Sequence, residues 1–182
     1  MPIEGLPIEG GSRETVMPIR VLVVDDHALI RMALIDLLSA APDIQVAGEC
    51  SDGSQVAGAV ATTSPDVVLM DLQMPYVDGL EAARELRARA PGVRVVILSG
   101  GLTAARAREA KAAGVAGFLL KDGDPDELAD QVRGVAAGGT AWHSFAEVLA
   151  EAAPAGRTDD GSRLPAGRSP QRLEGQPPRR RA

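Results

Sequence analysis

The stretch "VVLMDLQMPYVDGLEA", residues 67–82, opens as an apolar run typical of a buried strand and then breaks at an aspartate. Asp71 and Pro75 are both poor strand residues, so local propensity disfavours them here unless a site uses them. Asp78 and Gly79 then turn the chain into a helical pattern. The segment therefore predicts a strand that ends in a functional carboxylate and is followed by a helix.

The same change from strand to helix recurs along the chain. Strands are predicted at 19–24, 44–49, 66–70, 94–99 and 116–120, and each is followed by a helical pattern. Strict alternation with short loops implies a parallel sheet with helices on both faces. The predicted fold is α/β, a doubly wound five-stranded parallel sheet over residues 19–140. Residues 1–18 are expected to be a disordered tail, and residues 141–182 a linker and a disordered Arg/Pro-rich tail.

Composition restricts the partners and the compartment. The 182 residues carry 19 basic and 25 acidic side chains, a net charge of -6, which disfavours a chain that coats nucleic acid or an anionic membrane. No apolar segment approaches the length of a membrane span, and the single cysteine, Cys50, cannot form an internal disulfide. We therefore expect a cytoplasmic protein with no membrane partner.

Polar side chains stand where the predicted strands end. In an open parallel sheet, ligands bind beyond the carboxyl ends of the strands. These ends carry Asp25, Asp26, Asp71, Ser99 and Lys121. Crowded carboxylates repel one another unless a cation lies among them, and Mg²⁺ prefers such oxygen ligands. One carboxylate can then attack phosphorus while the amine and the hydroxyl hold phosphoryl oxygens, so the set predicts a phosphoacceptor site.

Four motifs carry these residues: "VLVVDDHALIRMAL" at 21–34, "PDVVLMDLQMPYVDGLEA" at 65–82, "VVILSG" at 95–100 and "GVAGFLLKD" at 114–122. Through them the sequence resembles the receiver domains of two-component response regulators, and among these the NarL/LuxR-type subgroup. The resemblance covers residues 19–140. It implies the flavodoxin-like (βα)5 receiver fold and a non-enzymatic role in phosphorelay signal transduction.

The resemblance also implies roles for single residues. Asp71 would accept a phosphoryl group from a sensor histidine kinase. Asp26, Asp71 and the backbone carbonyl of Gln73 would hold Mg²⁺, with Asp25 acting mostly through water. Lys121 would pair with the phosphoryl group.

Two further residues would carry the switch. Ser99 would move to hydrogen-bond the phosphoryl group, and the ring of Phe118 would turn inward with it, so that partner binding changes and a homodimer is allowed on phosphorylation. A plain core role is an equal alternative for Phe118, because aromatic residues in central strands usually pack in the core. His27 is expected to be a solvated or capping imidazole and not a ligand, and Trp142 is expected to cover the last helix.

Other functions stay open. An Mg²⁺-dependent phosphohydrolase also uses a strand-end aspartate, but it usually needs a second aspartate two residues later, where this chain has Gln73. A non-phosphorylated interaction module is a third reading. Regulators of the NarL/LuxR type continue into a helix-turn-helix domain. The residues after 139 carry no such pattern, so DNA binding by this chain is not expected. We interpret it as a stand-alone receiver or, preferably, as derived from a DNA-binding transcriptional regulator that is truncated or frameshifted in its linker.

Overall fold

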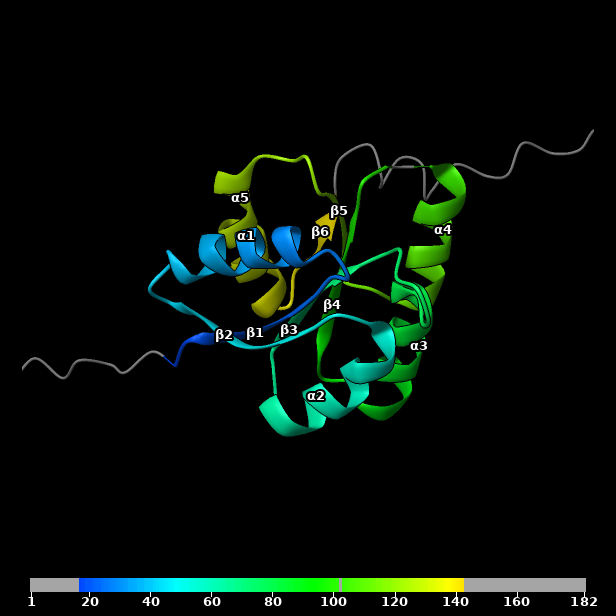
Figure 1. The fold of residues 1–182 in the computed structure, drawn as a ribbon, viewed down its shortest axis with the longest axis horizontal. Helices are drawn as coiled ribbons and strands as arrows, with labels where there is room; N and C mark the ends of the chain where they lie inside the picture. Colours follow the sequence, from blue (N-terminus) through cyan, green and yellow to red (C-terminus); the bar gives the residue numbers. More distant parts are fainter. Residues whose placement is uncertain (1–16, 102, 143–182) are drawn as a thin grey trace, which may run out of the picture. The chain divides into compact units, whose positions relative to one another are not determined.

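A six-stranded parallel sheet forms the centre of the computed structural model, which describes residues 17–101 and 103–142 (Figure 1). The strands are β1 (Ile19–Val24), β2 (Ile44–Cys50), β3 (Val67–Asp71), β4 (Arg94–Ser99), β5 (Gly117–Leu120) and β6 (Ala141–Trp142). Between them lie α1 (Ala28–Ser39), the 3-10 helix η1 (Gly53–Gln55), α2 (Val56–Thr63), α3 (Gly79–Arg89), α4 (Ala104–Ala113) and α5 (Pro125–Ala136). The predicted tails lie outside the described residues, apart from 17–18 and 141–142.

Helices cover both faces of the sheet (Figure 1). Val21 and Val23 of β1 join an apolar cluster with Leu38 of α1, and α5 contributes to the same cluster. The intervening residue Leu22 points to the opposite cluster, which contains Leu80 of α3 together with residues of α2 and α4. This alternation is what a strand buried on both sides requires. The predicted α/β class and parallel sheet are therefore confirmed.

The strand order is β2-β1-β3-β4-β5-β6, so the chain reverses direction across the sheet between β1 and β3. Ligands of open α/β sheets bind beyond the carboxyl ends of the strands at such a point. Asp25 and Asp26 follow β1, and Asp71 is the last residue of β3. The fold thus brings the acidic residues of two sequence-distant motifs to the same crevice.

The prediction of five strands differs from the structure by one. β6 pairs in parallel with β5, with Gly117 opposite Ala141 and Phe118 opposite Trp142. Trp142 packs against the cluster on the α2, α3 and α4 side, so the expectation that it covers the last helix, α5, is wrong. A strand of two residues shows no alternation in sequence, and its packing depends on a contact with Gly117 that only the folded chain brings about.

Candidate functional site

Four of the predicted site residues meet at the carboxyl edge of the sheet. Asp25, Asp71 and Ser99 are buried, with 0%, 3% and 5% of their surface exposed. The ammonium of Lys121 lies 2.6 Å from Oδ2 of Asp25 and 3.0 Å from Oδ1 of Asp71. One lysine therefore bridges the carboxylates that follow β1 and end β3.

Asp25 is held on both sides. Its Oδ1 accepts a hydrogen bond of 2.8 Å from the backbone N–H of His27, and its Oδ2 faces Lys121. Both oxygens of Asp25 therefore already have a partner within the chain. Asp26 is different, because its side chain is 25% exposed and its Oδ1, a buried oxygen, faces Nδ1 of His27 at 2.8 Å and no ammonium or guanidinium group among the described residues.

The electrostatics of the site follow from burial and from this shared lysine. Burial raises the pKa of the Asp71 carboxyl above its ordinary value; Lys121 opposes this effect and the charge of Asp25 adds to it. Burial acts to lower the pKa of Lys121, but its contacts with the two carboxylates raise it on balance. A single ammonium thus faces Asp25 and Asp71, with Asp26 as a third carboxylate beside them, and the local charge stays negative.

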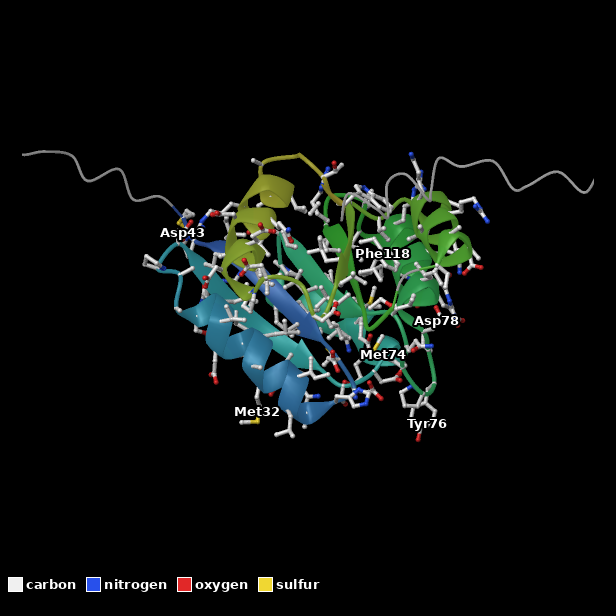
Figure 2. The ribbon with its side chains drawn as sticks, turned by 90° about the horizontal axis from the view of Figure 1, so that it is seen from above. Met32, Asp43, Met74, Tyr76, Asp78 and Phe118 are labelled. Atoms are coloured by element: carbon white, nitrogen blue, oxygen red, sulfur yellow. The ribbon has the colours of Figure 1, made fainter. Side chains whose placement is uncertain are left out.

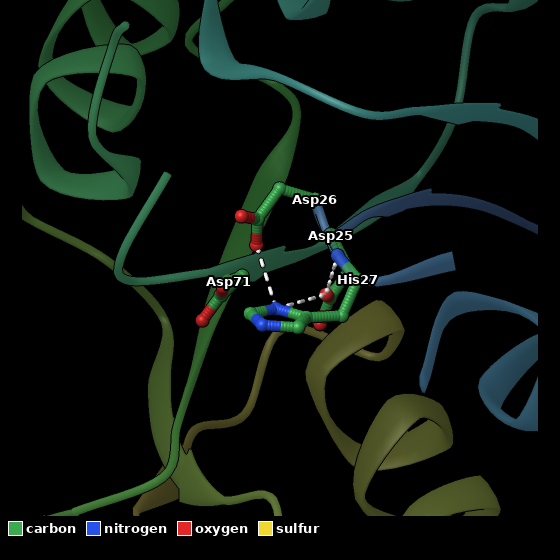
Figure 3. A group of neighbouring side chains, drawn as sticks. All are labelled: Asp25, Asp26, His27 and Asp71. Carbon is green, nitrogen blue, oxygen red and sulfur yellow. Dashed lines mark hydrogen bonds and ion pairs between the residues drawn. The ribbon is translucent and has the colours of Figure 1, made fainter. Parts of the chain in front are cut away.

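An oxygen-preferring cation fits these residues. The side chains of Asp25, Asp26, His27 and Asp71 each offer a ligand atom within 4.8 Å of the others (Figure 3). The buried Oδ1 of Asp26 has no lysine or arginine partner among the described residues, so a cation there would offset the cost of burying its charge. The arrangement could hold a divalent metal, with carboxylate oxygens of Asp26 and Asp71 as its natural ligands.

The loop after Asp71 is fixed by the start of α3. A Cβ on Gly79 would lie 2.2 Å from the backbone oxygen of Asp71, so only glycine allows the helix to approach the strand end this closely. Asp78 caps α3, because its Oδ1 accepts hydrogen bonds from the N–H groups of Leu80 and Glu81 at 2.9 and 2.8 Å. Gln73 is exposed in the loop between Asp71 and the cap.

The two predicted switch residues, Ser99 and Phe118, belong to β4 and β5. The hydroxyl of Ser99 donates to the backbone oxygen of Gly101 at 2.7 Å, so in this structure it is engaged by its own loop. Phe118 is fully buried in the apolar cluster below α3 and α4 (Figure 2). An inward ring is what both the core and the switch interpretations require, and the two alternatives for Phe118 stay open.

His27 is the residue that sequence reasoning placed outside the site. It is the N-cap residue of α1, yet its side chain makes no capping hydrogen bond. Its Nδ1 lies 2.8 Å from Oδ1 of Asp26 and 3.7 Å from Oδ1 of Asp25 (Figure 3). Of the two expected roles, the solvated one agrees with a side chain that is 66% exposed, and the capping one is wrong. The signal that could have found it is its position directly after the aspartate pair.

Fold and site together define a doubly wound α/β domain with an acidic, lysine-bridged pocket at the carboxyl edge of its sheet. Residues 21–133 match the model of the response regulator receiver domain. The chain therefore belongs to the response regulator receiver family.

Relatives and solved structures agree with this assignment. The transcriptional regulatory protein LiaR of Bacillus subtilis is 38% identical over 120 residues, which are 66% of this chain and 57% of LiaR. The nitrate/nitrite response regulator NarL of Escherichia coli is 36% identical over 121 residues, 66% of this chain and 56% of NarL. The signal receiver domain of NarL from Mycobacterium tuberculosis superposes with a TM-score of 0.65 at 35% identity, covering 67% of this chain and 98% of that one. The chain thus spans little more than half the length of the curated relatives.

Among the described residues, no helix combines the length and the apolar character that crossing a membrane requires.

Proposed function

We propose that residues 19–140 act as the receiver of a two-component pathway, with Asp71 as the phosphoacceptor and a sensor histidine kinase as the phosphodonor. The observation that carries the proposal is the buried contact of 3.0 Å between Asp71 and Lys121 at the end of β3. A buried carboxylate beside a fixed ammonium is poised for attack on phosphorus, because the ammonium can accompany the charge on the incoming phosphoryl oxygens.

The transfer itself needs few groups. A carboxylate oxygen of Asp71 forms a bond to phosphorus as the P–N bond of the donor's phosphohistidine breaks, and the imidazole leaves with that electron pair. Lys121 stays within reach of a phosphoryl oxygen, and Asp25 holds Lys121 in place through its contact of 2.6 Å. The product is an acyl phosphate on Asp71.

Mg²⁺ would be held by Asp26, Asp71 and the backbone carbonyl of Gln73, with Asp25 acting mostly through water. When bound, it neutralises the carboxylates and the phosphoryl oxygens. The buried Oδ1 of Asp26, which has no lysine or arginine partner among the described residues, supports this assignment.

The acyl phosphate is proposed to change partner binding. Ser99 would leave its bond to Gly101 for a phosphoryl oxygen, and Phe118 would adjust with it, altering the surface formed by α4, β5 and α5. The relative LiaR is a transcriptional regulatory protein, so we propose that this switch, in the cytoplasm, serves the control of transcription, with phosphorylation-dependent homodimer formation as one route.

The test is phosphorylation of the full chain by acetyl phosphate with Mg²⁺, followed by intact mass. The protein should gain one phosphoryl group, and Asp71→Asn should gain none. Asp36→Asn, a change at an exposed aspartate of α1, is the matched control and should be labelled like the unmodified chain. Equal labelling of Asp71→Asn would overturn the assignment.

The rival functions predict other outcomes. A phosphohydrolase would turn over a phosphomonoester. The position of its usual acid/base residue holds Gln73, however, and a side-chain amide cannot act as a general acid or base near neutral pH. A non-phosphorylated interaction module would show no labelling at Asp71 at all.

A further inference from the structure

The imidazole of His27 has no structural task that the described residues account for. Its side chain is 66% exposed, it makes no capping bond to α1, and it nevertheless faces the two aspartates before it (Figure 3). The backbone at His27 is extended, with φ -83° and ψ 105°, and the helix begins at the next residue. This places the ring over the acidic pocket and away from the amides that a capping side chain would bond.

The distances match those between ligands of one metal ion. Two adjacent ligands of an octahedral ion, each about 2.1 Å from it, lie about 3 Å apart. Nδ1 of His27 and Oδ1 of Asp26 are 2.8 Å apart, which is the separation expected of two adjacent ligands. Both atoms can therefore direct lone pairs to a common point.

Asp25 leaves room for such a ligand. Its two oxygens face the His27 backbone N–H and Lys121, which compete with a metal for them. The Nδ1 of His27 lies 3.7 Å from Oδ1 of Asp25 and within 4.8 Å of ligand atoms of Asp26 and Asp71.

We propose that His27 is a nitrogen ligand of the cation site and that it shifts the preference of the site from Mg²⁺ toward first-row transition metals. Mg²⁺ favours oxygen ligands and keeps its waters, whereas imidazole suits the later divalent ions. The inference rests on the cation site of the proposed function, and it adds a ligand that the resemblance did not imply.

The experiment uses Mn²⁺ as the probe on the full chain. Electron spin-echo spectroscopy detects the nitrogen of a directly coordinated imidazole, and the signal of free Mn²⁺ gives the affinity. The chain has two histidines, so His143→Ala is the matched control for His27→Ala. We expect the imidazole signal to persist in His143→Ala and to vanish in His27→Ala, with Mn²⁺ affinity reduced about tenfold or more. Mg²⁺ affinity, measured by competition, should fall by a smaller factor.

His27→Gln provides a second variant that keeps a polar side chain, and unfolding curves of both variants check that the fold persists. Asp26→Asn separates the two levels of the proposal. If Mn²⁺ binds, is lost in Asp26→Asn, and shows the same affinity and spectrum in His27→Ala, His27 is no ligand while the cation site stands. If the unmodified chain binds neither Mn²⁺ nor Mg²⁺, the cation site of the proposed function is itself refuted.

Discussion

Replacing Gly117 by alanine should release β6 from the sheet. A Cβ at this position would lie 2.3 Å from the backbone oxygen of Ala141 and 3.0 Å from its carbonyl carbon. Both atoms belong to backbone, which cannot turn aside as a long side chain can. Either β6 moves away from β5, or the end of the sheet is strained.

The loss of stability can be estimated from the interactions that β6 makes with the rest of the sheet. The hydrogen bond from the N–H of Ala141 to the oxygen of Ala116, 3.0 Å long, is worth about 1 kcal/mol net. The buried methyl of Ala141 adds about 0.8 kcal/mol. The packing of Trp142 beside Phe118 adds about 1 kcal/mol. The free energy of unfolding should therefore fall by about 2–3 kcal/mol, within the range for overpacking.

The assay uses Trp142, the only tryptophan of the chain. In Gly117→Ala, its emission should shift to the red under native conditions, because the indole gains contact with water, and urea unfolding should begin at lower concentration. Gly134→Ala in α5 is the matched control, since a Cβ there meets nothing within 4 Å. That change should be neutral or stabilising by up to about 1 kcal/mol. Unchanged emission and an unchanged unfolding midpoint in Gly117→Ala would refute the packing of β6 on Gly117.

Two predictions concern pH. The folded-state pKa of Asp71 is raised, mainly by burial, so between its ordinary value and the raised one the folded chain binds more protons than the unfolded chain, and stability falls as pH rises. Without metal, Asp71→Asn should therefore stabilise the protein at pH 7, and this stabilisation should be lost near about pH 4. Urea unfolding at both pH values measures the effect. An equal stabilisation at the two pH values would contradict the argument that burial raises the pKa of Asp71. The second concerns Asp43, whose pKa is lowered to about 2, chiefly by its hydrogen bond with Arg133. The stability that this pair contributes is present above the ordinary pKa of 3.8 and is lost as the pH falls toward 2. Arg133→Gln should therefore return the pKa of Asp43, measured by NMR titration, to near 3.8. A pKa that stays near 2 in this variant would show that the shift has another cause.

The strands and the acidic site could be predicted because their signals are local. Asp71 interrupts an apolar run, and the sheet rule then carries Asp25 and Lys121 to the same edge. These signals need only the order of the elements. They contain no information on distances, so they could not predict that one lysine contacts both Asp25 and Asp71.

The sixth strand and the contact of His27 with Asp26 were missed for a different reason. β6 depends on the absence of a side chain at Gly117, which has meaning only once Ala141 has been brought beside it. The contact of His27 with Asp26 depends on the direction that its side chain takes in the folded chain. Both are properties of the assembled chain, and residue type alone favoured the blander interpretations.

One wall of the pocket is rigid. Gly79 lies against the backbone of Asp71, and Asp78 holds the first turn of α3, so the strand end that carries the carboxylate is tied to a helix. A second contact supports this loop, because the N–H of Tyr76 donates to Oδ2 of the buried Asp52 at 3.2 Å. Gly79, Asp78 and the backbone of Tyr76 therefore all support the strand end that carries Asp71.

The opposite wall is loosely packed. Among the described residues, a Cβ on Gly100 or Gly101 would meet nothing within 4 Å, and the hydroxyl of Ser99 has hydrogen bonds with Gly101 alone. Since Asp71 is tied to α3 and this loop has free space, the proposed phosphoryl group on Asp71 is expected to be met by movement of Ser99 and not by movement of Asp71. This asymmetry supports the proposal that the switch lies at the end of β4, because the loop there can move while the surroundings of Asp71 stay as they are.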